Sequence, residues 1–220
     1  MKKMTVLFLV LMFAFSACAS AEQLAVAISD DAGMLVFCDA ALEVSDVDDD
    51  GNLTVYDALY AAHQMGYDGG AAAGLDTGDF GYGLSLTKLW GVDNGGSYGY
   101  YVNDMAAMSL DDAVFDGAYV RAYAYTDLEN WSDTYACFDV HAASTAAGEA
   151  FKLSLCAIDW NGGSATVVGA EILVNGEASG ILTGKNGEAE ITFEQAGNYI
   201  ISARTDAFAM VAPVCFVSVE

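Results

Sequence analysis

The feature that most constrains the fold is a series of short strand patterns at regular spacing in the second half of the chain. These patterns cover residues 151–158, 164–176, 187–197, 198–205 and 210–220. Asn175-Gly176 and Asn186-Gly187 mark turns between alternating runs, and Asn-Gly is a preferred sequence for a two-residue hairpin loop. Short strands joined by tight turns predict an all-β sandwich for this half.

The first half mixes strand patterns with one helical segment. Residues 54–65 place Val55, Leu59 and Ala62 on one helical face. Extended segments are predicted at residues 35–44, 84–92, 98–103 and 118–126, and the Gly- and Ala-rich segment 66–83 predicts a long surface loop. We expect two domains, at residues 22–142 and 143–220, divided at the small-residue stretch that begins at 142.

The first 21 residues have the pattern of a secretory signal peptide. Lys2 and Lys3 precede an apolar run over residues 4–15, and Ala19-Ser20-Ala21 forms a small-x-small cleavage site. The alternative is lipidation at Cys18, which the bulky Phe15 disfavours. We therefore expect an extracellular or cell-surface protein without a further transmembrane span.

The chain is strongly acidic, with a formal net charge of −24. This charge argues against nucleic acid as a partner, because phosphate binding needs clustered Lys and Arg. Neither Lys nor Arg occurs between Lys3 and Lys88, so this stretch repels itself unless it binds cations or keeps its charges solvated. A 55% content of hydrophobic residues argues for packed domains rather than a disordered acidic tail.

The sequence DVDDDGNLTVYD, which begins at residue 46, has the spacing of a calcium-binding loop. An EF-hand-type loop takes oxygen ligands from positions 1, 3, 5, 7, 9 and 12, and it turns at a Gly in position 6. Gly51 holds position 6, and the ligand positions hold Asp46, Asp48, Asp50, Asn52, Thr54 and Asp57. The pattern therefore predicts a structural Ca²⁺ site.

Two departures and one alternative accompany this prediction. Position 12 is Asp57 rather than a bidentate Glu, and a strand rather than a helix precedes the loop; both features resemble dockerin-like and other extracellular variants, whose affinities are about 10⁻⁴ to 10⁻³ M. In the alternative, Thr54 and Asp57 form a capping box for the following helix, and the acids make a solvated turn. The capping box does not account for the acids at 46, 48 and 50.

Aromatic residues crowd the middle of the first domain. On a strand, Tyr98 and Tyr100 share one face while Tyr101 lies on the other. One interpretation is a core face backed by a cross-strand aromatic ladder. The other is a ligand platform on which a sugar or another flat ligand stacks, with candidate residues Trp90, Tyr98, Tyr101 and Trp131.

In order and spacing, the motifs LTVYDALYAAH, LTKLWGV, SYGYYVND and DGAYVRAYAYTD resemble the transcobalamin-like C-terminal domain of bacterial surface proteins. This resemblance covers about residues 35–127 and implies an α+β, β-grasp-like domain with one helix. Asp104 and Ala118 depart from the family pattern. In animal relatives the domain helps to hold cobalamin, so the resemblance also implies corrinoid binding as an alternative.

Residues 183–203, TGKNGEAEITFEQAGNYIISA, resemble bacterial Ig-like domains, which serve as spacers or adhesive modules. Fold alone assigns no chemistry to such a domain. The sequence therefore leaves two functional classes open. One is a module that binds a glycan, a corrinoid or a surface protein, and the other is a structural spacer.

Catalytic patterns are missing from the sequence, and we expect no enzyme. The two histidines lie in different contexts, His63 on the surface of the predicted helix and His141 near the domain division, and no Ser occupies a nucleophile elbow. Four cysteines remain after signal cleavage, at positions 38, 137, 156 and 215, and three pairings are open to them. The simplest joins Cys38 to Cys137 and Cys156 to Cys215, and the alternative is four buried thiols.

Overall fold

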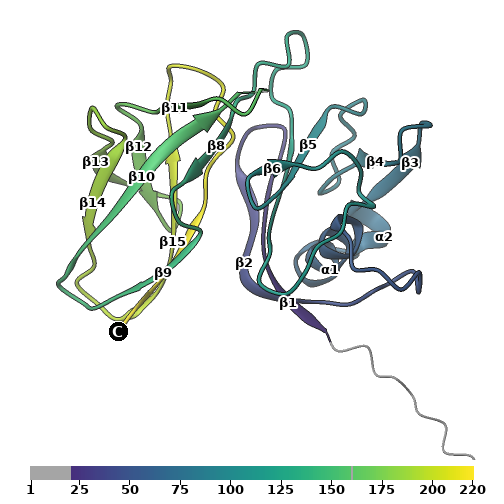
Figure 1. The fold of residues 1–220 in the computed structure, drawn as a ribbon, viewed down its shortest axis with the longest axis horizontal. Coiled ribbons are helices and arrows are strands. Elements are labelled where there is room, and N and C mark those ends of the chain that lie inside the picture. The colour runs from purple at the N-terminus through teal and green to yellow at the C-terminus, as the bar shows by residue number, and fades with distance from the viewer. Residues whose placement is uncertain (1–20, 160) are drawn as a thin grey trace, which may run out of the picture.

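The computed structural model describes residues 21–159 and 161–220 and consists mostly of β-strands in two lobes (Figure 1). The predicted signal peptide and Cys18 lie outside the described residues, apart from the peptide's last residue, Ala21. In the described part, no helix has the length and apolar character needed to cross a membrane.

The N-terminal lobe contains seven strands and two helices among the residues from 21 onward that the structure describes. In chain order they are β1 (Glu22–Ser29), β2 (Leu35–Val44), α1 (Val55–Gly66), α2 (Ala71–Gly74), β3 (Asp76–Asp79), β4 (Leu84–Lys88), β5 (Tyr98–Val102), β6 (Met105–Ala106) and β7 (Tyr119–Ala124). Five of the strands form one sheet in the order β2-β1-β7-β5-β6, and β3 pairs with β4 beside it. The central pair β1 and β7 is parallel, and the other neighbours are antiparallel.

The C-terminal lobe contains only strands among its described residues. They are β8 (Tyr135–Phe138), β9 (Ala142–Thr145), β10 (Ala150–Ile158), β11 (Ser164–Thr166), β12 (Glu171–Val174), β13 (Glu177–Leu182), β14 (Glu188–Thr192), β15 (Gly197–Arg204) and β16 (Cys215–Val219). One sheet has the order β11-β10-β14 with β8 beside β10, and the other has the order β13-β12-β15-β16-β9. The two sheets enclose an apolar core that includes Phe138, Leu155, Ile172 and Ile201. The predicted all-β sandwich is therefore confirmed for this half.

The predicted α+β, β-grasp-like class is wrong, because strands account for 47% of the described residues and helices for only 8%. Part of the difference between the predicted and the observed fold lies in residues 66–83, where we expected a loop. This segment forms α2 and β3, and β3 pairs with β4 through Thr77 opposite Leu86. This pairing is a local hairpin, which the Gly- and Ala-rich composition of the segment does not indicate.

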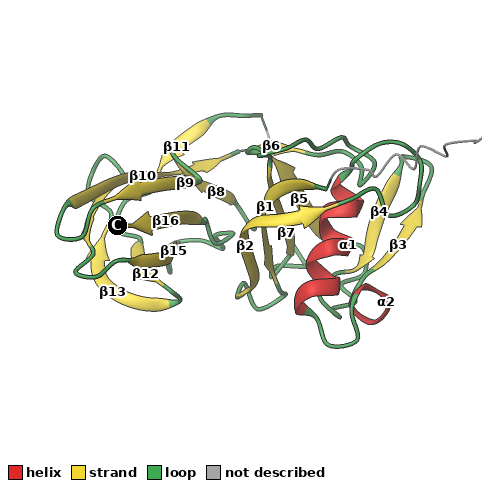
Figure 2. Ribbon diagram, turned by 90° about the horizontal axis from the view of Figure 1, so that it is seen from below, coloured by secondary structure: helices red, strands yellow, loops and turns green. Residues whose placement is uncertain are grey.

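Helix α1 covers one face of the N-terminal sheet (Figure 2). Val55, Leu59 and Ala62 are fully buried against this face, as the helical spacing predicts. From β7, Val120 and Ala122 pack into the same core. Burial of these side chains removes apolar surface from water, at roughly 25 cal/mol per Å².

The opposite face of the same sheet packs on the C-terminal lobe. Tyr123 of β7 and Tyr125 just after it lie in one apolar cluster with Tyr135 and Cys137 of β8. Arg121 of β7 is also buried between the lobes, where its guanidinium donates to the carbonyl of Ala212 at 3.2 Å. Both faces of β7 are therefore buried, and so are all six of its residues. Strand β8, which precedes the predicted division at residues 142–143, pairs with β10 of the sandwich.

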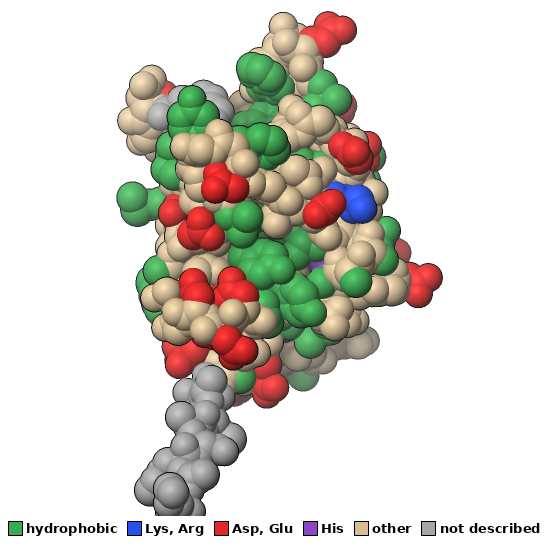
Figure 3. Space-filling model, turned by 90° about the vertical axis from the view of Figure 1, so that its right-hand side faces the viewer, with side chains coloured by type: hydrophobic (Ala, Val, Ile, Leu, Met, Phe, Trp, Pro, Cys, Tyr) green, Lys and Arg blue, Asp and Glu red, His purple; other side chains and the backbone are tan. Residues whose placement is uncertain are grey.

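Acidic side chains are spread over the outer end of the N-terminal lobe, around a group of hydrophobic side chains (Figure 3). This distribution fits the long stretch without Lys or Arg that precedes Lys88. The acids at this end lie largely at the surface, where water screens their mutual repulsion.

Candidate functional site

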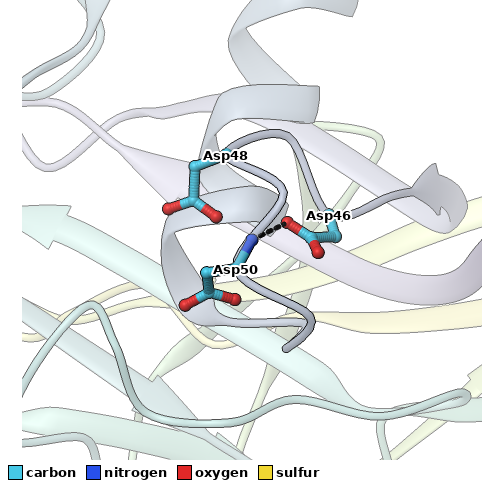
Figure 4. A group of neighbouring side chains, drawn as sticks. All are labelled: Asp46, Asp48 and Asp50. Carbon is cyan, nitrogen blue, oxygen red and sulfur yellow. Dashed lines mark hydrogen bonds between the residues drawn. The ribbon is translucent and has the colours of Figure 1, made fainter.

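The acidic loop between β2 and α1 brings three of its carboxylates together (Figure 4). Each of Asp46, Asp48 and Asp50 offers an oxygen that lies within 4.8 Å of those of the other two. The chain turns sharply here, since Asp49 has a φ of 61° and Gly51 a φ of 87°. Left-handed backbone is accessible to Gly at no steric cost and is tolerated by Asp, which explains why these residue types suit these positions.

Hydrogen bonds within the loop hold the carboxylates in place. Asp46 accepts a 2.8 Å bond from the N–H of Gly51, and this bond lowers the pKa of its carboxyl. Asp50 accepts a 2.7 Å bond from the N–H of Asn52. Desolvation, followed by the charge of Asp50, raises the pKa of Asp48. Such a cluster of carboxylate oxygens suits a hard cation, and a bound cation would offset the repulsion among the three charges.

Two of the six predicted calcium ligands serve the start of α1. The Asp57 carboxylate is buried and accepts from the N–H of Thr54 at 2.8 Å and from the Thr54 hydroxyl at 2.7 Å. Its other oxygen accepts from the N–H of Val47 at 2.9 Å, which ties the acidic loop to the helix. The Asp57 N–H in turn donates to the Thr54 hydroxyl, which completes a capping box. The side chain of Asp57 therefore turns to the helix N-terminus, apart from the three clustered acids.

The four aromatic residues predicted to form one ligand platform lie in different places. Trp90 packs with Phe37, His63 and Tyr67 at the end of α1. The Tyr98 ring packs in the core beneath α1, and its hydroxyl accepts a 2.7 Å bond from the N–H of Asn94. Tyr101 and Trp131, by contrast, line the same pocket. The predicted platform thus reduces to these two residues.

This pocket, which we call the tyrosine pocket, has a volume of about 340 Å³ and lies where the N-terminal sheet meets β8 and β10. Its aromatic lining is Tyr101, Tyr123, Tyr125, Trp131 and Tyr135. The rings of Tyr101 and Tyr135 are stacked, with centroids 3.8 Å apart and planes at 9°. Trp131 keeps 60% of its surface exposed, so its ring is available to a ligand.

The polar groups of the tyrosine pocket are hydroxyl, amide and carboxylate groups. Its described lining residues include Asp133 and Asp159 but neither Lys nor Arg. Asp133 is only 8% exposed, and its carboxylate accepts from the N–H groups of Thr126 at 2.8 Å and Asp127 at 2.9 Å. Burial raises the pKa of Tyr101, so this phenol keeps its proton at neutral pH. The pocket therefore presents neutral aromatic faces beside hydrogen-bond acceptors.

Three aromatic residues of the tyrosine pocket were not predicted from the sequence. Tyr123 and Tyr125 occur at alternate positions of the segment AYVRAYAYT, a spacing that places them on one strand face. Local spacing does not say that this face meets another lobe. Tyr135 belongs to a segment far along the chain, and only the packing of β8 against the sheet brings its ring to Tyr101.

The two histidines lie apart from the tyrosine pocket. His63, which we expected on the helix surface, is fully buried because its face of α1 meets Trp90. Its Nδ1 lies 2.6 Å from the carbonyl oxygen of Leu59, and its Nε2 accepts from the N–H of Trp90 at 2.9 Å. Burial lowers the pKa of His63, which favours the neutral ring. His141 lies at the lobe junction, with Nε2 at 2.9 Å from Asp104.

Comparisons with known proteins identify no family. No protein-family description and no curated protein match the sequence. The fibronectin(III)-like modules of CbhA from Clostridium thermocellum are 16% identical, with a TM-score of 0.31, over 56% of this chain and 77% of theirs. The four N-terminal Ig domains of Dscam1 isoform 9.44 are 12% identical, with a TM-score of 0.28, over 60% of this chain and 29% of theirs. The D0-D1 domain of Intimin is 13% identical, with a TM-score of 0.27, over 54% of this chain and 75% of its own length. Scores this low carry no functional information.

Proposed function

We propose that this protein is an exported, non-catalytic binding or adhesion module that takes a small ligand into the tyrosine pocket and a structural Ca²⁺ into the acidic loop. The observation that carries this proposal is the meeting of Tyr101 and Trp131 with three further tyrosines in one pocket at the lobe junction. Ligand pockets commonly form at such junctions and combine aromatic walls with a few polar groups. A spacer would need no such pocket.

The chemistry of the tyrosine pocket favours a glycan as the ligand. Aromatic faces stack on the apolar face of a sugar ring, and the carboxylates of Asp133 and Asp159 can accept hydrogen bonds from its hydroxyl groups. A volume of about 340 Å³ lies near the lower end of the range for ligand pockets, roughly 300–1,000 Å³. This size suits one or two sugar rings better than a corrinoid macrocycle.

The calcium part of the proposal is supported by the three converging carboxylates and by the turn at Gly51. Asp46, Asp48 and Asp50 would hold the ion through their side chains, while Thr54 and Asp57 secure the helix that follows. The ion would offset the repulsion within the loop and stabilise its connection to α1 through Val47 and Asp57.

A thermal melt tests the calcium site. With a Kd of about 10⁻⁴ to 10⁻³ M, 10 mM Ca²⁺ stabilises the folded state by about 1.4 to 2.7 kcal/mol. For a chain of this size we expect a rise in Tm of roughly 3–10 °C. Asp48→Ala with Asp50→Ala should abolish the rise. Asp31→Ala with Asp68→Ala removes the same charge away from the loop and should retain it. An unchanged Tm of the wild type in Ca²⁺ would rule the site out.

Tryptophan fluorescence across a panel of glycans and corrinoids tests the ligand site. Because Trp131 is exposed at the pocket, a bound sugar should change its emission. Trp131→Ala should weaken binding about 10-fold, which calorimetric titration measures because this variant lacks the fluorescent reporter. Tyr82→Ala is the matched control, since Tyr82 is 90% exposed and does not line the pocket. Equal losses from the two variants, or binding of corrinoids alone, would contradict the glycan proposal. Absence of binding across the panel would favour the spacer.

A further inference from the structure

Two of the four described cysteines face each other across a pair of antiparallel strands. Cys137 on β8 and Cys156 on β10 are register partners. Their Sγ atoms lie 3.5 Å apart, and both cysteines are free thiols in this structure. The pair lies in the cluster that joins the two lobes, beside Tyr123, Tyr125 and Tyr135.

The strand geometry is compatible with a covalent bond between these thiols. Facing residues of an antiparallel pair have Cα atoms about 4.5–5.5 Å apart. A disulfide needs a Cα separation of about 4.4–6.8 Å and a sulfur separation of about 2.05 Å. The thiols of Cys137 and Cys156 therefore need to approach by about 1.5 Å from the 3.5 Å at which they lie, which a small change of side-chain torsion supplies.

The remaining cysteines have no comparable partner in the described chain. Cys215 lies in the core of the C-terminal sandwich, whereas Cys38 packs at the lobe junction beside Val214 and Phe216. Among the described thiols, only those of Cys137 and Cys156 contact each other. The simplest pairing expected from the sequence, Cys38 with Cys137 and Cys156 with Cys215, does not fit this arrangement.

We propose that Cys137 and Cys156 form a cross-strand disulfide when the protein meets a disulfide oxidant, such as the exchange partners found outside the cytoplasm. Cys156 is the more accessible of the two and reacts first: its thiolate attacks the oxidant disulfide and releases one thiol. Cys137 then attacks the mixed disulfide and releases the second thiol. The two protein thiols lose two protons and two electrons, and the oxidant is reduced to two thiols.

The bond would fix two walls of the tyrosine pocket to each other. Tyr135, on β8, and Ile158, on β10, both line the pocket, and each lies two residues from one of the paired cysteines. A disulfide that closes the loop between Cys137 and Cys156 raises Tm by roughly 5–10 °C in a protein of this size. The oxidised protein should therefore hold the pocket more rigidly than the reduced one. Only this consequence rests on the proposed function, whereas the bond itself rests on the strand pairing.

The test is a cysteine map of the full chain after oxidation by oxidised glutathione. One sample is oxidised in the folded state, and a second is unfolded and refolded in a glutathione redox buffer, so that poor access to the buried thiols cannot hide the bond. Alkylation, proteolysis and mass spectrometry without reductant should then show one peptide pair, joined through Cys137 and Cys156, with Cys38 and Cys215 alkylated. The two joined cysteines together lose about 2 Da, the mass of two hydrogen atoms.

Single substitutions make the assignment specific. Cys156→Ala should remove both the linked peptide pair and the oxidation-dependent rise in Tm. Cys38→Ala, also on a strand and partly buried, should retain both. Alkylation of both Cys137 and Cys156 in both samples, or a disulfide that includes any other cysteine, would overturn the proposal. The map requires neither calcium nor a glycan, so its failure is distinguishable from failure of the proposed function.

Discussion

Among single residues, Asp57 connects the acidic loop to the N-terminal cap of α1. Its carboxylate accepts a hydrogen bond from the N–H of Val47 in the acidic loop. It also accepts hydrogen bonds from the N–H and the hydroxyl of Thr54 at the helix cap. A buried carboxylate is tolerated only when its acceptor capacity is used, and here three donors use it. The negative charge also lies in the first turn of α1, where it interacts favourably with the helix dipole.

We predict that Asp57→Asn destabilises the protein by about 1–3 kcal/mol, with or without calcium. The substitution puts an NH₂ group where a carboxylate oxygen accepts hydrogen bonds, so at least one buried donor loses its partner. Urea denaturation measures the free energy of unfolding. Asp68→Asn, at an exposed position, is the control. A loss of stability that appears only in Ca²⁺ would mean that Asp57 acts as a metal ligand rather than as a cap.

Asp127 provides a prediction about pH. Hydrogen bonds from the hydroxyl of Ser132 and the N–H of Asn130 lower the pKa of this carboxyl from 3.8 to about 2. Because the folded-state pKa is depressed, the contribution of Asp127 to stability is fully present above pH 3.8 and is lost as the pH falls toward 2. Wild-type Tm should therefore fall more steeply between about pH 4 and pH 2 than that of Asp127→Asn. Parallel profiles in thermal melts would contradict the prediction.

Among the elements, strands β5 and β7 pair in a way that brings one side chain of β7 close to the backbone of β5. Gly99 of β5 pairs with Tyr123 of β7, and a Cβ at Gly99 would collide with the Tyr123 ring. The absence of a side chain at Gly99 therefore lets this ring lie over β5 and line the tyrosine pocket. A glycine in a strand often marks such an approach.

We predict that Gly99→Ala displaces the Tyr123 ring, lowers stability by about 1–3 kcal/mol and weakens ligand binding. Gly184→Ala is the matched control. Its added Cβ would make only an ordinary 3.6 Å contact with the carbonyl oxygen of Glu188. Urea denaturation and the glycan titration measure the two effects. If Gly99→Ala is as stable as the wild type and binds as well, the ring does not need this space.

For the whole molecule, the junction between the lobes is polar as well as aromatic. Arg121 is only 1% exposed, and its guanidinium donates to the carbonyls of Ala27 at 3.0 Å, Ala122 at 2.7 Å and Ala212 at 3.2 Å. Asp104 accepts from the hydroxyl of Tyr135 at 2.7 Å across the same junction. Apolar burial and buried hydrogen bonds therefore connect the lobes, and loss of a hydrogen-bond donor leaves buried acceptors unpaired.

We predict that the lobes unfold in a single calorimetric transition and that Arg121→Met lowers its Tm. Methionine fills part of the space but donates no hydrogen bonds, and each buried acceptor left unpaired costs about 1–3 kcal/mol. Lys185→Met is a surface control that removes the same charge from an exposed turn. Two well-separated transitions in the wild type would show that the junction is too weak to couple the lobes.

The sequence by itself determined the features that depend on local spacing. Alternation and the Asn175-Gly176 turn indicated the sandwich, although the second predicted hairpin turn, Asn186-Gly187, connects strands of different sheets. The spacing of Val55, Leu59 and Ala62 indicated α1, and the acids around Gly51 indicated the loop that clusters them. Each rests on a pattern or a motif that is local in the sequence. Over such short stretches, backbone geometry alone sets the direction in which each side chain points and the way the chain turns.

Only the tertiary structure decided which surfaces meet. The packing of the sheet on β8 and β10 brought Tyr101 to Tyr135, buried Arg121 and placed Cys137 opposite Cys156. Packing on Trp90 likewise buried His63. A strand pattern shows that one face of the strand is apolar, but it does not show which segment of the chain packs against that face. The partner is selected by the burial and hydrogen bonding of segments far apart in the chain, because only their joint packing excludes water and pairs the buried polar groups.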